Sequence, residues 1–235
     1  RRQHGVSCMT DALAGLVAAA AAFVGTHFAL SHPLRRPLVR LAGEKGFQAL
    51  YSLVAFATFG WLVLAFRAAP AGAPLWDGFA GVPWLAATAL MLIASVLLIG
   101  SFLGNPALPA PKAAVLAAKA PHGVFHVTRH PMMWSFALCS AAHILVSPTP
   151  RVLVLALAMA LLALVGSHLQ DRKKQALMGP AWSGWEAQTS YWPRFGNLGK
   201  AGLLPWLGGT ALWLGATWAH GWLIAMPAGI WRLVG

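Results

Sequence analysis

The chain has 235 residues, of which 58% are apolar and only 9% are charged. A soluble domain carries about 25% charged residues, so this composition excludes an ordinary water-soluble protein. It also excludes a disordered chain, and the two cysteines, Cys8 and Cys139, are too few for a disulfide scaffold. The net charge of +12 comes from residues between the apolar runs, so it indicates membrane loops and no nucleic acid partner.

Six windows without Asp, Glu, Lys or Arg are long enough to cross a bilayer, whose hydrocarbon core of about 30 Å takes roughly 20 residues. They predict an all-α, polytopic integral membrane protein with about six transmembrane helices in one bundle. The fourth window is bounded by prolines at both ends, and a buried half-span is the alternative for it. The windows cover residues 12–30, 47–66, 82–103, 131–148, 152–170 and 204–226.

The first residues precede a natural start at Met9. We therefore expect residues 1–8 to form a disordered tail and residues 9–235 to form a single transmembrane domain. A cleaved signal peptide is the rival interpretation, because two arginines open the chain and small residues lie around 18–22. The apolar run continues past those small residues, which favours a retained helix.

The basic residues sort unequally between the two sides of the predicted bundle. Twelve of the 17 Lys and Arg fall in loops one, three and five, against five in the other loops and the termini. By the positive-inside rule, the odd loops lie in the cytoplasm and both termini lie outside it. The twelve basic residues would meet the lipid bilayer at its anionic lipids.

Two of the cytoplasmic loops are long. Loop three, at about 104–130, begins with Gly and Pro and is expected to start as irregular chain. Loop five, at about 171–203, places aromatic residues among a few charges, which predicts an anchoring belt at the headgroup level. Its aromatic residues are Trp182, Trp185, Tyr191 and Trp192.

Histidine is the main ionisable residue inside the spans, since membrane acids are almost lacking. His27 lies in the first window and His143 in the fourth. Two histidines on facing helices suit a bis-histidine haem, whereas no Cys/His cluster has the spacing of a zinc site. The alternative for each is a core histidine bonded to a carbonyl. The predicted depths of the two differ, so His130 and His168 are kept as alternate ligands.

The sequence Arg129-His130-Pro131 stands just before the fourth helix. A helix N-terminus favours anions, so this segment predicts an anion or nucleotide-carboxylate contact; a snorkelling Arg and a helix-starting Pro are the alternative. Asp171, three residues after His168, is interpreted as part of an ion network at a helix end, or as a group that orients His168.

Several short motifs in this order resemble the NnrU family of bacterial membrane proteins. The resemblance covers about residues 12–197 and implies the bacterial inner membrane and a link to denitrification and nitric oxide metabolism, with respiratory or denitrification membrane proteins as partners. The motifs are His27-Phe28-Ala29, Glu44-Lys45-Gly46-Phe47, Leu50-Tyr51-Ser52-Leu53, His130-Pro131-Met132, Ala142-His143 and Asp171-Arg172.

The NnrU family is homologous to plant 15-cis-zeta-carotene isomerase, a membrane enzyme that holds haem b with histidines. Its histidine motifs match His27 and His143, so the resemblance implies haem b iron bound by these two residues, with redox chemistry, nitrogen-oxide metabolism or a haem-dependent isomerisation as the activity. A further candidate ligand of the plant enzyme is a cysteine three residues before its second histidine. This chain has Ser140 there, with Cys139 one place off.

A second resemblance is to isoprenylcysteine carboxyl methyltransferases and related phospholipid methyltransferases. It rests on Arg129-His130-Pro131-Met132 and Tyr191-Trp192-Pro193. It implies S-adenosylmethionine as an alternative cofactor, with Arg129, His130, His168 and Asp171 as candidate cofactor-binding residues. The later acidic pair of those enzymes is absent, because Asp171 is the only acid nearby. A non-catalytic partner or assembly factor of a respiratory complex is the third hypothesis.

Overall fold

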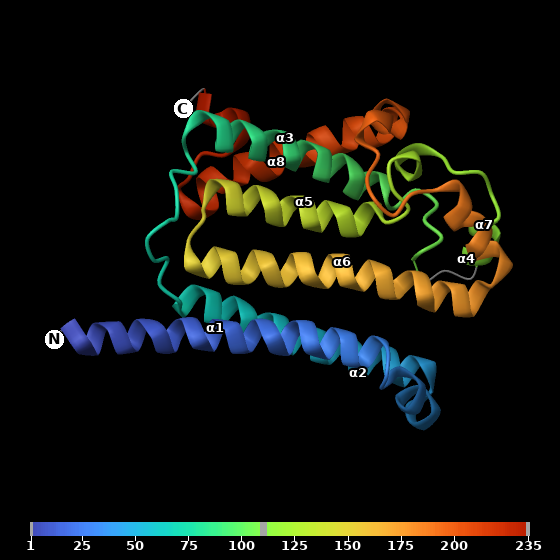
Figure 1. Ribbon diagram of the computed structural model, residues 1–235, viewed down its shortest axis with the longest axis horizontal. Helices are drawn as coiled ribbons and strands as arrows, with labels where there is room; N and C mark the ends of the chain where they lie inside the picture. Colours follow the sequence, from blue (N-terminus) through green and yellow to red (C-terminus); the bar gives the residue numbers. More distant parts are fainter. Residues whose placement is uncertain (1, 109–111, 234–235) are drawn as a thin grey trace. The chain divides into compact units, whose positions relative to one another are not determined.

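The computed structural model describes residues 2–108 and 112–233, with side chains described from residue 11 onward (Figure 1). Within these ranges every regular element is a helix, which confirms the all-α class. The α-helices are α1 (Arg2–Ser31), α2 (Arg35–Ala68), α3 (Gly81–Gly100), α4 (Ala113–Ala117), α5 (Pro131–Val146), α6 (Pro150–Met178), α7 (Pro180–Gln188) and α8 (Leu203–Ile224), and the short 3₁₀ helices are η1 (Gly123–His126), η2 (Phe195–Ala201) and η3 (Gly229–Leu233).

Four of these helices are long and apolar enough to cross a membrane: α1 from Asp11 onward, α2, α3 and α6. They contain the first, second and fifth predicted windows and residues 82–100 of the third. The fourth window forms α5, a shorter apolar helix of 16 residues. The sixth forms α8, a helix of 22 residues that is not among these four. The membrane character of the chain is therefore supported.

The first two helices extend beyond their predicted windows. α1 begins at Arg2 and so includes residues 2–8 of the segment expected to be a tail. α2 begins at Arg35 and is interrupted at Gly43, where φ is 71° and ψ is 171°. Glycine adopts this positive φ without the steric penalty that a Cβ would bring. The interruption separates a short basic helical segment from the apolar part of α2.

The chain divides into two compact units, Arg1–Gly78 with Ser147–Leu162, and Phe79–Val146 with Ala163–Gly235. In the first unit, the apolar core joins α1, α2 and the first half of α6. The end of α2 is fixed to the start of α6 by Arg151, whose Nη1 donates to the carbonyl of Ala69 at 3.2 Å and whose guanidinium lies 5.1 Å from the Phe66 ring. The start of α6 therefore belongs to this unit. The core residues are Leu16, Ala19, Ala20, Phe23, Val24, Leu62 and Ala69.

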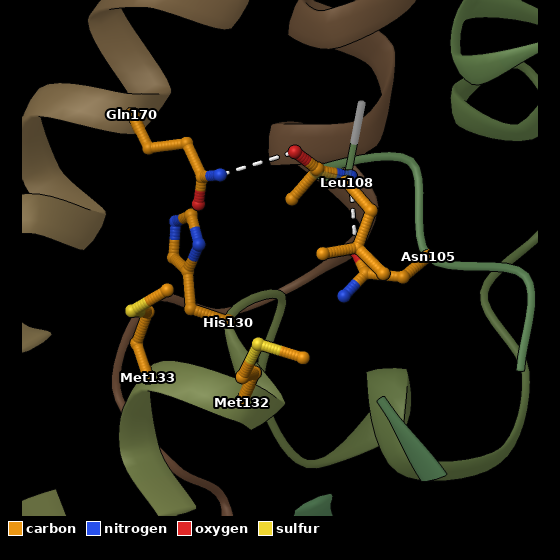
Figure 2. Close-up of a pocket in the computed structure, with 7 residues that line it drawn as sticks. Asn105, Leu108, His130, Met132, Met133 and Gln170 are labelled. Carbon is orange, nitrogen blue, oxygen red and sulfur yellow. Dashed lines mark hydrogen bonds between the residues drawn. The ribbon is translucent and has the colours of Figure 1, made fainter. Parts of the chain in front are cut away.

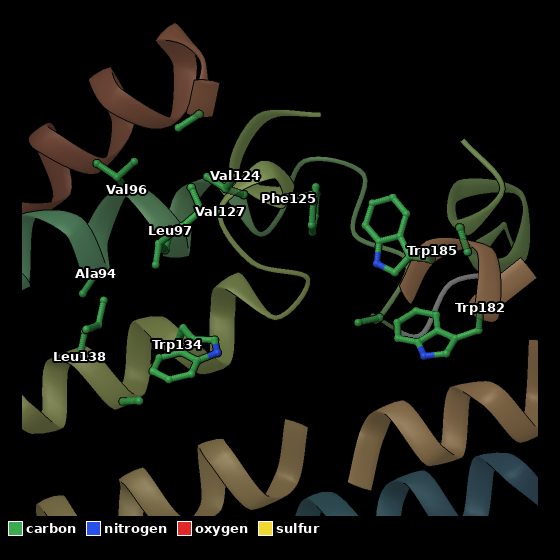
Figure 3. Close-up of a cluster of buried hydrophobic side chains, with 14 residues drawn as sticks. Ala94, Val96, Leu97, Val124, Phe125, Val127, Trp134, Leu138, Trp182 and Trp185 are labelled. Atoms are coloured by element: carbon green, nitrogen blue, oxygen red, sulfur yellow. The ribbon is translucent and has the colours of Figure 1, made fainter. Parts of the chain in front are cut away.

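In the second unit, α3 packs against both α5 and α8 (Figure 1). Small residues allow the close approach of α8 to α3. A Cβ added at Gly209 would lie 2.6 Å from Cα of Val96, which is a steric clash. Only glycine, which has no Cβ, fits at this position. The core of this unit is formed by apolar residues of α3, η1, α5 and α7 (Figure 3).

Two tryptophans of the predicted aromatic belt lie in that core. Trp182 and Trp185 are 0% and 1% exposed, and the Trp185 ring lies 5.4 Å from the Phe125 ring in an edge contact (Figure 3). The belt prediction is wrong for these two, because α7 places residues three apart on one buried face. Trp192 is 68% exposed and remains compatible with a headgroup position.

The contact between α8 and α3 can be tested with Gly209→Val. The added side chain would clash with the backbone of Val96, so we expect the free energy of unfolding to fall by about 1–3 kcal/mol, the usual cost of overpacking. Thermal unfolding in detergent, followed by tryptophan fluorescence, measures the loss. Gly215→Val on the same helix is the control, because nothing lies within 4 Å of its added Cβ. Equal melting temperatures for the two variants would contradict the close contact.

Candidate functional site

The segment before α5 is held by main-chain hydrogen bonds to the chain that follows α7. The N–H of Arg129 donates to the carbonyl of Ser190 at 2.8 Å, and the N–H of Arg194 donates to the carbonyl of Val127 at 2.9 Å. Between these bonds, Thr128 Oγ1 donates to the carbonyl of Tyr191 at 2.8 Å. These bonds fix the direction in which the side chains of Arg129 and His130 leave the backbone.

Tyr191 attaches the same chain to α6 and to α5. Its hydroxyl lies 2.7 Å from the carbonyl oxygen of Leu164, to which it donates, and 2.9 Å from Oγ of Ser167. Its carbonyl also accepts a bond of 2.8 Å from the indole N–H of Trp134 on α5. One residue of loop five thus connects both helices that carry the site.

Asp171 on α6 accepts hydrogen bonds from Arg129 and from His130, each on a different carboxylate oxygen. Its Oδ2 accepts from Nε and Nη2 of Arg129 at 2.9 and 2.6 Å, and its Oδ1 accepts from Nε2 of His130 at 2.8 Å. The carboxylate is buried, and the His130 side chain is 0% exposed. Glu186 lies further from the guanidinium, at 3.5 Å from Nη2. We call Arg129, His130 and Asp171 the Asp171 cluster.

The Asp171 cluster leaves one buried nitrogen without a partner. A carboxylate can only accept, so Nε2 of His130 carries a hydrogen, and Arg129 already compensates the negative charge of Asp171. Nδ1, the other ring nitrogen, is buried and has no hydrogen-bond partner in the described structure. A small pocket adjoins this ring (Figure 2), and its lining residues are Asn105, Ala107, Leu108, His130, Met132, Met133 and Gln170.

Three of the four predicted cofactor-binding residues therefore meet. The fourth, His168, is exposed on α6, and the histidine that Asp171 orients is His130. Asp171 therefore orients a histidine, as one of its two interpretations expected, but that histidine is His130 and not His168. Nε and Nη2 of Arg129 both donate to Asp171, so these two nitrogens are not available to an external carboxylate. The guanidinium carbon also lies 5.5 Å from the centre of the Tyr191 ring.

The two predicted haem ligands share one local arrangement. Nδ1 of His27 donates to the carbonyl of Phe23 at 2.7 Å, and Nδ1 of His143 donates to the carbonyl of Cys139 at 2.8 Å. In both cases the acceptor lies four residues earlier in the same helix, and both side chains are half-buried. Because Nδ1 holds the hydrogen, Nε2 keeps the lone pair that a metal ion needs. His27 belongs to the first unit and His143 to the second, and each is described within its own unit.

A third histidine has the same arrangement and was not selected from the sequence. Nδ1 of His220 donates to the carbonyl of Ala216 at 2.9 Å, and its ring lies 6.4 Å from that of His143. Its position in an apolar window was visible in the sequence, but no motif linked it to His143. Among the residues that the structure describes, no three His, Cys, Asp or Glu side chains form a group that could hold a metal ion.

The Asp171 cluster predicts a large effect of Asp171→Asn. The neutral amide leaves the almost buried guanidinium of Arg129 uncompensated, so we expect a loss of about 3–5 kcal/mol in the free energy of unfolding. Glu186→Gln is the matched control, since this more exposed pair should contribute about 0–1 kcal/mol. Thermal unfolding of both variants in detergent measures the difference. A stability of Asp171→Asn close to that of Glu186→Gln would show that the cluster contributes little.

A match to one protein family covers most of the chain. Residues 15–228 match the family described as NnrU protein. The match includes α8, which lies beyond the reach of the sequence resemblance that ends near residue 197. Neither the curated proteins nor the solved structures contain a significant match to the chain. The chain belongs to the NnrU family.

Proposed function

We propose that this NnrU-family membrane protein binds haem b, which the Nε2 atoms of His27 and His143 would hold. The activity we propose with it is redox chemistry, nitrogen-oxide metabolism or a haem-dependent isomerisation. Its site of action would be the bacterial inner membrane, next to respiratory or denitrification membrane proteins.

The proposal rests on the sequence motifs that match His27 and His143, and the hydrogen bonds of the two imidazoles are compatible with it. Metal-bound histidines usually donate their other ring N–H to a carbonyl or a carboxylate, which fixes the tautomer and the ring orientation. His27 and His143 both do so through a carbonyl of their own helix. The Phe23 ring lies 4.3 Å from the His27 ring and restricts it further. Both residues thus present an oriented Nε2 atom.

Haem iron requires only two such donors from the protein, in contrast to the three or four that zinc takes. When bound, haem b would supply one-electron chemistry or bind a diatomic molecule.

The methyltransferase alternative gains no support from the site. An S-adenosylmethionine site of the predicted kind needs Arg129 to face a ligand carboxylate, but Asp171 holds two of its nitrogens. A non-catalytic partner of a respiratory complex would need no cofactor. It is distinguished from our proposal by the first experiment below.

Haem binding is tested by purifying the protein in detergent from cells supplied with haem. We expect a Soret band whose absorbance per protein falls several-fold in His27→Ala and in His143→Ala, because each removes one nitrogen donor. Added imidazole should restore part of the band in both variants by replacing that donor.

His220→Ala is the matched control, because His220 has the same bond to a carbonyl of its helix. Its band should equal that of the wild type. A colourless wild-type protein after reconstitution with haem would refute haem binding. A band lost in His220→Ala and kept in His27→Ala would transfer the second ligand to His220.

We also propose that both termini and the even loops lie outside the cytoplasm. The charge asymmetry supports this orientation. In a background without Cys8 and Cys139, Ala73→Cys should react with a membrane-impermeant maleimide in spheroplasts. Gly199→Cys should react only after the membrane is opened; nothing lies within 4 Å of a Cβ there. The opposite labelling pattern would reverse the orientation.

A further inference from the structure

The first two turns of α2, up to the interruption at Gly43, lie between two helices of membrane length. α1 from Asp11 to Ser31 and the apolar part of α2 are each long enough to cross a bilayer, so the chain between them lies at a membrane surface. The N–H of Leu38 donates to the carbonyl of Leu34 at 3.1 Å, so the helical turn includes Leu34. We call residues 34–42 the basic segment (Figure 1).

The basic segment has an apolar face and a basic face. Leu34, Leu38 and Leu41 are spaced by four and three residues, so a helix places them on one side. Leu34 and Leu41 are 45% and 85% exposed. Arg36 and Arg40 are four residues apart and lie on the other side of the helix, where both are exposed. This division is typical of a helix that lies in the plane of a membrane surface.

The basic face has no counter-charge in this unit. Among the residues that the structure describes, no hydrogen bond or ion pair engages Arg36 or Arg40. Glu44 is the only acid among residues 12–76, and its carboxylate is paired with Arg35. Two like charges one helical turn apart repel each other. An external anion that contacts both guanidinium groups would remove this repulsion.

The start of the basic segment is fixed to the ends of both neighbouring helices. The guanidinium of Arg35 forms its ion pair with Glu44 and lies 5.4 Å from the centre of the Phe47 ring on the apolar part of α2. Phe47 is buried, and its ring lies 6.0 Å from that of Tyr51. Oγ of Ser31, at the end of α1, donates to the Tyr51 hydroxyl at 3.4 Å. The two faces of the segment therefore keep a fixed relation to these helices.

Three surroundings can be compared for such a segment. In water the three leucines would remain hydrated, and in the hydrocarbon core the two arginines would lose their hydration. In the headgroup layer the leucines enter the acyl chains while the guanidinium groups stay among the phosphates. A guanidinium presents paired N–H donors that match the oxygens of a phosphate. An anionic phospholipid supplies this phosphate without the cation that a zwitterionic headgroup adds.

We propose that the basic segment lies in the headgroup layer and binds an anionic phospholipid. The guanidinium groups of Arg36 and Arg40 donate to the lipid phosphate. The side chains of Leu34, Leu38 and Leu41 contact the acyl chains. This assigns one defined site within the general attraction between basic loops and anionic lipids. It does not depend on the proposed haem site.

The position of the segment is tested in liposomes of phosphatidylcholine and phosphatidylglycerol. The full-length protein, without Cys8 and Cys139, carries one spin label at either Leu41→Cys or Arg40→Cys. The label at Leu41→Cys should be more accessible to oxygen, which concentrates in the hydrocarbon, than to a water-soluble nickel chelate. The label at Arg40→Cys should show the opposite preference, because it leaves the other side of the helix. A preference for the chelate at both positions would place the segment in water and overturn the proposal.

The phosphate contact is tested by native mass spectrometry of the full-length protein in detergent, titrated with phosphatidylglycerol. Arg36→Gln combined with Arg40→Gln should weaken binding of the first lipid by about tenfold or more, because each basic residue near an anionic surface contributes a several-fold factor. Lys112→Gln combined with Lys119→Gln is the matched control and should bind as the wild type does. It removes the same charge from two exposed lysines seven positions apart.

Further arms separate this site from other sources of binding. Arg36→Lys combined with Arg40→Lys keeps both charges and should bind more tightly than the glutamine pair. Excess inorganic phosphate should leave the lipid bound, since it offers no acyl chain to the leucines. Equal losses in the glutamine pair and the lysine control would indicate diffuse attraction by net charge and overturn the site. Equal wild-type affinity for phosphatidylcholine and phosphatidylglycerol would overturn the choice of an anionic lipid.

Discussion

The second unit depends on the hydrogen-bonded ion pair between Asp171 and Arg129. This pair joins α6 to the segment before α5, two parts of the chain that are 42 residues apart. Burying a carboxylate or a guanidinium alone is costly, and each is tolerated here because the other compensates it. Since the same carboxylate holds His130, the pair also determines where the imidazole stands and which of its nitrogens is free.

Much of the fold could be predicted from the sequence, because it depends on local composition. Long apolar windows without charge gave the helices α1, α2, α3 and α6, and the prolines at 131 and 150 marked the starts of α5 and α6. The extension of α2 back to Arg35 was not predictable from hydropathy, since that segment is basic and is separated from the apolar part by Gly43. The burial of Trp182 and Trp185 also escaped prediction, because α7 lacks the length and apolar content that mark a buried element in the sequence.

The site was predicted in part, for a similar reason. Arg129, His130 and Asp171 were each selected, but Asp171 was interpreted as part of an ion network at a helix end or as a group that orients His168, three residues away. The true partner, His130, comes from a distant segment, and one sequence carries no signal for such a pair. The same limit applies to Ala107, whose peptide group organises Asn105 and Gln170 although alanine has no polar side chain.

The bond from Nδ1 to the carbonyl four residues earlier has a consequence for how these histidines can evolve. At His27, His143 and His220 the acceptor belongs to the main chain, so every amino acid at the earlier position supplies it. Phe23, Cys139 and Ala216 differ in size and polarity, yet Nδ1 of the histidine donates to the carbonyl in all three cases. The helix backbone thus takes the place of a dedicated orienting side chain. Substitutions around such a histidine can change its packing without changing which nitrogen it presents, so a lineage can alter the surroundings of a ligand site while its donor atom stays constant.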